Sequence, residues 1–182
     1  LNAEEHATMD DGAHTQDEET RGKAYKLAPD EGPAHWFTNA LVTIKAGGAE
    51  TGQRLTIAQI LHPAGYSPPT HRHLVEDESF YILSGTALFE SDGERFEVGP
   101  GDFAFLPRGS VHTFAAGSDG PFSCLVITVP AGFENFVAEA GTPAERRELP
   151  DPVPVDGAAL AAIAARHQIE ILGPPLSARE NP

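Results

Sequence analysis

The sequence predicts an all-β protein built as an antiparallel barrel or jelly roll. From residue 35 onward, short runs rich in β-branched and aromatic residues follow one another, among them HWFTNALVTI, RLTIAQIL, SFYIL, TALFES and FSCLVITV. Gly, Pro or Asp separates almost every pair of runs, as is typical of strands joined by turns. A chain of 182 residues is long enough to bury one core. Many short strands around one core favour a barrel or jelly roll, which encloses an interior and leaves few exposed edges.

Three segments differ in composition. Residues 1–31 carry clustered acids and few large apolar groups, which predicts a solvated, partly disordered arm. Residues 32–130 hold the strand-like runs and form the predicted barrel. Residues 131–182 are predicted to be a helical extension of that barrel.

Two short helices are expected in this extension. Phe133, Phe136 and Val137 have the spacing of an amphipathic helix. A second helix is predicted near 156–168, where Asp156 can cap its first turn. Packing against the barrel is the expected role of these helices, and a lid over the barrel mouth is the alternative.

The turns between the strands have recognisable signals. Asp92 and Gly93 lie between TALFE and RFEV and predict a tight hairpin. Further along, Gly101 and Gly109 permit sharp bends, and Pro107 fixes the backbone ahead of a predicted strand. These residues are expected to direct that strand without carrying chemistry themselves.

Charge and hydropathy exclude several function classes. The formal net charge of −15 repels polyanions, so we expect no nucleic-acid or anionic-membrane partner. No apolar run reaches about 18 residues, and the first residues are acidic where a signal peptide would be basic, which predicts a cytoplasmic protein. Cys124 lies inside the run FSCLVITV and is expected to be a buried apolar side chain.

Four side chains in two stretches have the types and spacing of a metal site. His71 and His73 are two residues apart, so one strand can present both imidazoles on the same face. Glu78 follows five residues after His73, which requires a bend in LVED to bring it to the same side. His112 follows the turn-forming stretch LPRG and must be returned to the others by the fold.

This ligand set limits the metal without naming it. Three imidazoles and one carboxylate suit divalent Fe, Mn, Co, Ni, Cu or Zn, and the lack of thiolates argues against an iron–sulfur cluster. No separate organic cofactor is expected.

Both stretches resemble the two motifs of the cupin superfamily. The first motif, G-x5-H-x-H-x3/4-E-x6-G, is matched by Gly65, His71, His73, Glu78 and Gly85. The second, G-x5-P-x-G-x2-H-x3-N, is matched by Gly101, Pro107, Gly109 and His112, while Ala116 stands in place of its closing Asn. The resemblance implies a double-stranded β-helix, with His71, His73, Glu78 and His112 as the metal ligands. It also implies a homodimer.

The flanking segments widen the resemblance to about residues 33–150. HWFTNALVTIKAGG and VPAGFENFVAEAGTPAE are similar to the single-domain bacterial quercetinase-like cupins. This similarity implies a dioxygenase that cleaves a flavonol or related enolic aromatic compound with O₂ and releases carbon monoxide. Glu78 would then also be the catalytic base that takes the proton of the substrate's 3-hydroxyl. A metal-dependent isomerase or cyclase without O₂, and a non-catalytic small-molecule-binding cupin, are the alternatives.

An apolar, aromatic cavity is expected around the metal, suited to a flat organic substrate. Its candidate wall residues are those that alternation could turn inward: Phe80, Tyr81, Leu83, Phe103, Phe105 and Phe114.

Overall fold

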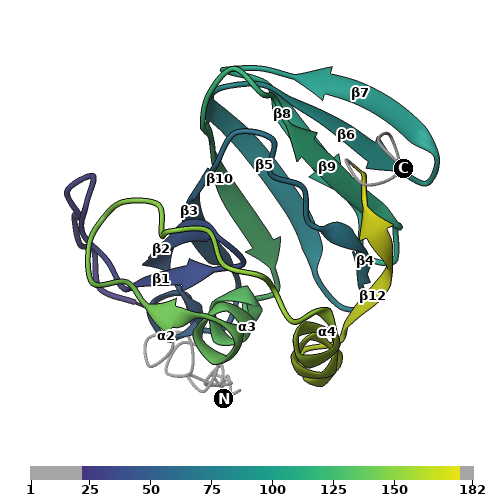
Figure 1. The fold of residues 1–182 in the computed structure, drawn as a ribbon. Coiled ribbons are helices and arrows are strands. Elements are labelled where there is room, and N and C mark those ends of the chain that lie inside the picture. Colours follow the sequence, from purple (N-terminus) through teal and green to yellow (C-terminus); the bar gives the residue numbers. More distant parts are fainter. Residues whose placement is uncertain (1–21, 177–182) are drawn as a thin grey trace, which may run out of the picture.

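Two antiparallel sheets form the body of the protein (Figure 1). The computed structural model describes residues 22–176 of the chain. The seven-stranded sheet has the order β11, β1, β2, β3, β10, β5, β8, with β1 (Ala34–Phe37), β2 (Ala40–Ala46), β3 (Thr56–His62), β5 (Asp77–Ser84), β8 (Phe103–Leu106), β10 (Phe122–Val129) and β11 (Thr142–Pro143). The five-stranded sheet has the order β12, β4, β9, β6, β7, with β4 (Pro69–His73), β6 (Ala87–Ser91), β7 (Glu94–Val98), β9 (His112–Ala116) and β12 (Ile169–Pro175). The predicted all-β jelly roll is confirmed.

The core lies between the two sheets, on the faces that the strands turn toward each other. Phe89 of β6 and Phe122 of β10 are fully buried, and Ile82 of β5 is 1% exposed. Burying a side chain of this size favours folding by about 1.5–3 kcal/mol. The hairpin predicted between β6 and β7 is also present, because Asp92 and Gly93 both have positive φ, as a tight turn of this type requires.

The aromatic residues of β5 and β8 separate into two faces. Phe80 is 4% exposed and Phe114 of β9 is 5% exposed, so both point inward as expected. The predicted inward orientation is wrong for four other side chains. Both β5 and β8 carry large apolar groups on both faces, so alternation alone does not tell which face is inside. These four side chains lie on the outer face: Tyr81 (43% exposed), Leu83 (40%), Phe103 (61%) and Phe105 (55%).

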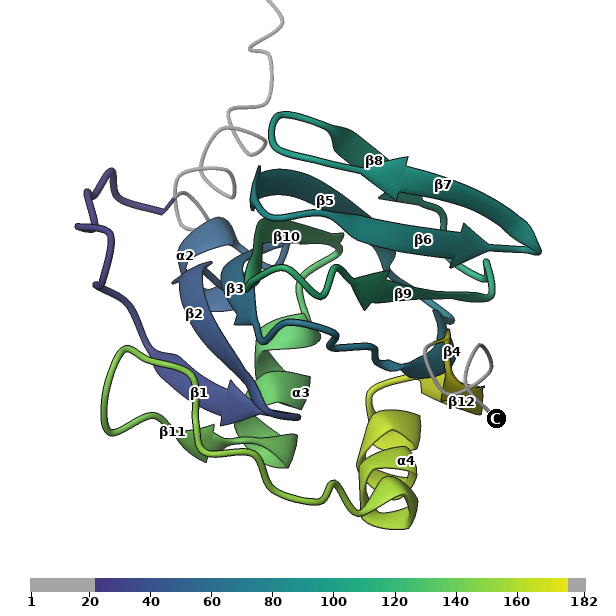
Figure 2. The same cartoon turned by 45° about the horizontal axis from the view of Figure 1, so that its top comes forward.

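Both predicted C-terminal helices are present. α3 spans Phe133–Ala140, and α4 spans Gly157–Arg166 with the Asp156 carboxylate accepting two backbone N–H groups of its first turn. A further short helix, α2 (Gly48–Thr51), follows β2. α3 and α4 contact each other and lie at the same end of the sheets (Figures 1 and 2).

The description of residues 131–182 as helical is incomplete, because this segment also contributes two strands. β11 extends the larger sheet beside β1, and β12 pairs with β4 at the edge of the smaller sheet. The sequence ILGPP in β12 did not suggest a strand, since Gly and Pro are poor strand formers. An edge position tolerates Pro because one side of the strand needs no hydrogen-bond partner.

Most of the predicted acidic arm, residues 1–21, lies outside the described residues. Residues 22–31 contain no helix or strand. No helix within residues 22–176 is long and apolar enough to cross a membrane.

Candidate metal centre

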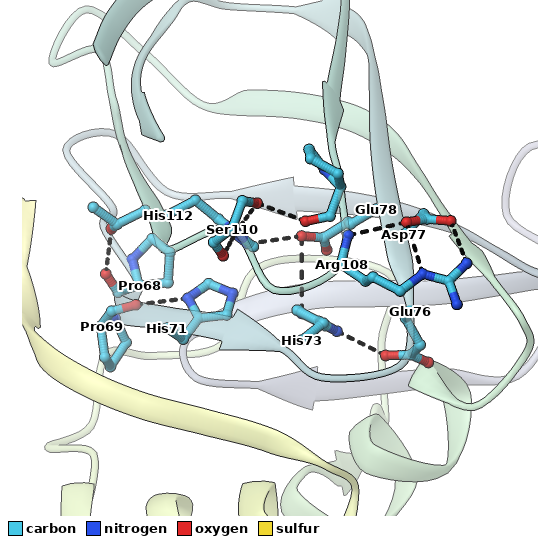
Figure 3. A network of polar contacts seen from close by, with 12 residues as sticks. Pro68, Pro69, His71, His73, Glu76, Asp77, Glu78, Arg108, Ser110 and His112 are labelled. Carbon is cyan, nitrogen blue, oxygen red and sulfur yellow. Dashed lines mark hydrogen bonds and ion pairs between the residues drawn. The ribbon is translucent and has the colours of Figure 1, made fainter. Parts of the chain in front are cut away.

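The four predicted ligands meet at one point between the two sheets (Figure 3). β4 carries His71 and His73 on the same face, and His112, the first residue of β9, is paired in register with His71. Glu78 reaches the same point from β5 of the other sheet. Residues far apart in sequence therefore present their ligand atoms together, as the motifs predicted.

The bend expected between His73 and Glu78 is confirmed. β4 ends at His73, β5 begins at Asp77, and the chain passes from the smaller sheet to the larger one over residues 74–76. The Gly109 N–H donates to the carbonyl of His73 at 2.7 Å, which ties this bend to the loop that precedes His112. The two motif stretches thus fix each other's position.

The distances among the ligand atoms fit a single ion. The four atoms all lie within 4.8 Å of one another, and Oε2 of Glu78 is 3.2 Å from Nε2 of His112 and 3.9 Å from Nε2 of His73. Ligand atoms about 2.0–2.2 Å from a common ion are about 3 Å apart at right angles and about 4 Å apart in line. The spread of the four atoms is therefore close to what one divalent metal requires.

Each imidazole of the cluster is oriented by its other ring nitrogen. The Nδ1 partners are the carbonyl of Pro69 for His71 (2.8 Å), the carboxylate of Glu76 for His73 (2.7 Å) and the carbonyl of Ser110 for His112 (3.1 Å). When Nδ1–H donates to an oxygen, Nε2 is unprotonated and its lone pair is free to bind a metal. This is the arrangement seen in metal-bound histidines. The donor set is therefore arranged for a metal as well as close enough for one.

Burial and mutual charge shift the pKa values of the cluster. Burial lowers the pKa of His71 to about 3, with help from the charges of His112 and His73, so His71 is neutral at pH 7. Burial alone would raise the pKa of Glu78, but the charge of His73 and the hydrogen bond with His112 lower it to about 2. Neutral imidazole and ionised carboxylate are the forms that bind metals.

The pKa of His73 is shifted upward, in contrast to the pKa values of His71 and Glu78. Burial acts to lower its pKa, but the carboxylates of Glu78 and Glu76 together raise it above its usual value. In the absence of an ion, His73 therefore tends to carry the proton that balances the Glu78 charge. A metal that bound Nε2 of a protonated His73 would have to displace that proton.

The cluster faces a cavity whose remaining walls are mostly apolar. Aliphatic and aromatic side chains surround it from both sheets and from the C-terminal segment: Phe37, Ile60, Phe80, Phe114 and Val126 from the sheets, and Phe133, Phe136, Leu160, Ile169 and Ile171 from α3, α4 and β12. The C-terminal segment thus closes one side of the cavity. The expected aromatic cavity is present, with a wall that the sequence did not identify.

Two polar residues near the cluster were not predicted. Glu76 lies in the bend between β4 and β5 and orients His73. The sequence signal that could have identified Glu76 is an acid three residues after a ligand histidine. His62, the last residue of β3, also lines the cavity, and burial lowers its pKa to about 3 although the Glu78 charge acts to raise it. It ends an apolar strand, where nothing in the pattern distinguishes it from a core residue.

Cys124 and the two arginines of the motif stretches contribute no ligand atom to the cluster. Cys124 is fully buried, and burial raises the pKa of its thiol, which agrees with a packing role. Arg72 pairs with Glu170, and Arg108 pairs with Asp77 at the surface. None of these side chains offers an atom to the cluster within residues 22–176.

Comparison with known proteins agrees with this architecture. The cupin domain family matches residues 58–128, which include all four ligands. The chain is 29% identical over 127 residues to quercetin 2,3-dioxygenase of Bacillus subtilis, a match that covers 69% of this chain and 37% of the dioxygenase. The chain thus spans well under half the length of that relative.

Two solved structures share the fold at low sequence identity. A predicted oxalate decarboxylase of Thermotoga maritima matches with a TM-score of 0.55 and 19% identity, covering 58% of this chain and 99% of that one. The polyketide cyclase RemF of Streptomyces resistomycificus matches with a TM-score of 0.52 and 19% identity, covering 74% and 89% of the two chains. The two motifs and the match of residues 58–128 to the cupin domain family, together with the shared fold, identify a cupin domain in this chain.

Proposed function

We propose that the protein is a metal-dependent dioxygenase that cleaves a flavonol or a related enolic aromatic compound with O₂. The observation that carries this proposal is a three-histidine, one-carboxylate cluster facing an apolar cavity lined by aromatic side chains. A cavity of this kind suits a flat, weakly charged organic molecule, whereas a sugar phosphate would require Lys or Arg in the wall.

The cluster residues have distinct roles in this proposal. His71, His73 and His112 would hold the metal through Nε2, and Glu78 would complete the set. A divalent transition metal bound there supplies Lewis acidity and, where it is redox-active, the capacity to react with O₂.

Glu78 is the proposed proton acceptor for the substrate hydroxyl. Its carboxylate is ionised at neutral pH, so it has a free lone pair for the proton. The charge of His73 and the His112 contact hold its pKa low, and these effects weaken when the histidines are neutral, as a ligand must be. A bound divalent metal would supply positive charge in their place, so Glu78 would stay ionised and able to accept the proton.

The apolar walls would hold the rings of the substrate and keep water from the reacting atoms. Phe133 and Phe136 of α3 and Leu160 of α4 line the cavity together with strands of both sheets. Exclusion of water strengthens the electrostatic interaction between Glu78 and the substrate hydroxyl.

The Bacillus subtilis quercetin 2,3-dioxygenase supports the substrate class. Its similarity extends over 127 residues and so reaches well beyond the 71 residues matched by the cupin domain family. Because the present chain spans 37% of that enzyme, the activity is a proposal for this chain.

Oxygen uptake with quercetin is the direct test. Protein of measured metal content, loaded in turn with Fe(II), Mn(II), Co(II), Ni(II) and Cu(II), is expected to consume O₂, release carbon monoxide and bleach the flavonol absorption with at least one metal. Glu78→Gln should abolish turnover, while Glu170→Gln, which changes a carboxylate paired with Arg72 outside the cavity, should leave it unchanged.

Absence of O₂ uptake and of flavonol loss with every metal would refute the dioxygenase. Conversion of an aromatic substrate without O₂ would then support an isomerase or cyclase, the reaction class of the Streptomyces polyketide cyclase that shares the fold. A flavonol bound and returned intact, with unchanged affinity in Glu78→Gln, would support a binding protein.

We also propose that the protein forms a homodimer through the outer face of β5 and β8. Tyr81, Leu83, Phe103 and Phe105 form an exposed apolar surface there, and β8 is the last strand of its sheet. An edge strand beside an apolar face can pair with the same strand of a second copy about a two-fold axis. Sedimentation should give a dimer mass that Phe103→Ser with Phe105→Ser reduces to the monomer; a wild-type monomer would refute this assembly.

A further inference from the structure

His62 is a buried polar side chain that the proposed reaction leaves unused. It is 5% exposed, yet within residues 22–176 neither of its ring nitrogens has a hydrogen-bond partner. A buried polar group without a partner is uncommon because its lost hydration is not replaced. The unpaired state of His62 therefore requires an explanation. One explanation is that a bound ligand supplies the missing hydrogen-bond partner.

Aromatic rings fix the position of the His62 ring. It stacks on Tyr66 with ring centroids 4.6 Å apart and on Phe122 at 5.8 Å, and it meets Phe114 edge-on at 5.2 Å. These contacts hold the plane of the imidazole without using its nitrogens. The ring is thus placed by packing, and these contacts use neither of its nitrogens.

The contrast with the ligand histidines is direct. His71, His73 and His112 each have an oxygen partner at Nδ1, which leaves one nitrogen for the metal. His62 lines the same cavity but has no such partner and contributes no atom to the metal cluster. As a neutral imidazole it offers one donor and one acceptor, which suits a hydroxyl or carbonyl oxygen.

Other polar groups in the apolar part of the cavity already have a partner. The Tyr66 hydroxyl lies 2.8 Å from Oγ1 of Thr38, and both residues line the cavity. A ligand oxygen that does not bind the metal would therefore find in His62 an unpaired partner among the residues described.

We propose that His62 hydrogen-bonds a second oxygen of the bound substrate, distinct from the oxygens that chelate the metal. This inference rests on the proposed flavonol substrate and narrows its class. The cavity would select flavonols that carry further ring hydroxyls, such as quercetin, over 3-hydroxyflavone, which has only the chelating hydroxyl and carbonyl. His62 would thereby determine specificity and take no part in the chemistry.

Equilibrium binding tests the inference without turnover. Calorimetry on protein loaded with redox-inert Zn(II) would measure the affinities of quercetin and 3-hydroxyflavone for the wild type. Since one hydrogen bond in a buried site is worth about a factor of ten in affinity, the wild type should bind quercetin about tenfold more tightly than 3-hydroxyflavone.

Three variants complete the experiment. His62→Phe keeps an aromatic ring in the stack and should lose the preference while 3-hydroxyflavone binding stays the same. His62→Gln keeps a donor and an acceptor and should retain part of the preference. The matched control His35→Phe changes a histidine of β1 that also has an unpaired buried Nδ1 but does not line the cavity, and it should behave as the wild type.

The outcomes separate this inference from the proposed function. A wild type that binds both flavonols equally, or a His62→Phe protein that keeps the preference, overturns the role of His62 even where O₂ uptake is observed. A preference that depends on His62, without any O₂ uptake, supports the inference and refutes the dioxygenase. If neither flavonol binds the wild type, the substrate class named here is overturned together with the role of His62.

Discussion

The metal ligands and one side of the cavity's apolar wall come from different parts of the chain. The metal cluster is contained in residues 71–112, on β4, β5 and β9. The wall that faces it includes residues of α3, α4 and β12, all beyond residue 130. The metal ligands are thus all carried by strands within the barrel, whereas part of the wall around a substrate comes from a later segment. A change in one part can leave the other intact, and the following predictions test that independence.

The largest effect is expected at the metal ligands. His112→Ala removes one of four ligands and should weaken metal binding by more than about 100-fold, since even residues outside the ligand set cost 10–100-fold when changed. Metal content after dialysis and titration with Zn(II) would measure the loss. His167→Ala, which changes a histidine paired with Glu139 on α3, is the matched control and should bind metal normally. Retention of metal by His112→Ala would show that the four residues do not act as one site.

Substitutions in the apolar wall should instead change the stability of the protein and its affinity for substrate. Leu160→Ala removes a buried side chain of α4 and is expected to lower the free energy of unfolding by about 2–3 kcal/mol and to raise KM, with metal content unchanged. Urea unfolding, elemental analysis and steady-state kinetics would check these three values. Ile163→Ala on the same helix does not line the cavity and should leave KM unchanged. Loss of metal in Leu160→Ala would contradict the separation of the two parts.

Glu76 joins the ligand set to the bend between β4 and β5. Glu76→Gln keeps the shape but removes the charge that His73 contacts through Nδ1, so metal affinity should fall by about tenfold. Competition with a chelator of known affinity would measure it. An unchanged affinity would mean that packing alone orients His73.

The smallest expected effect is on the pH dependence of stability. The pKa of His62 is about 3 in the folded protein, below its usual value of 6.5, so between these values the unfolded chain binds a proton that the folded chain does not. Stability of the metal-free protein should therefore fall as pH decreases from about 6.5 to 4.5, with His62 contributing about 1 kcal/mol per pH unit. Urea unfolding at several pH values should give a shallower slope for His62→Phe. The same slope in both proteins would show that His62 is protonated or solvated in the fold.

The two parts of the cavity also differ in how far the sequence predicts them. The ligands were identified because His71 and His73 are separated by a spacing that has a local geometric meaning, and because Glu78 and His112 complete a motif. The partner strand β12 was missed because its pairing with β4 joins residues about a hundred positions apart, and its own composition disfavours a strand. Likewise, nothing near His62 in sequence shows that Tyr66, Phe114 and Phe122 surround it.

The outward-facing aromatic residues illustrate a different limit on what the sequence can predict about the fold. Tyr81 and Phe103 sit opposite each other on β5 and β8, and both strands alternate between two apolar faces. A period of two residues separates such faces but gives no reason to prefer one of them as the interior. Only the arrangement of the whole sheet decides which face becomes core and which becomes surface.

The pairing of β4 with β12 bears on when the metal site is completed during synthesis. β4 is registered with β9 at one position, His71 with His112, but with β12 along its length from Pro69 to His73. A ribosome-bound chain that has already exposed all four ligands would lack the strand that holds two of them straight. The segment that closes one side of the cavity thus also aligns the two ligand histidines of β4 through its pairing with that strand.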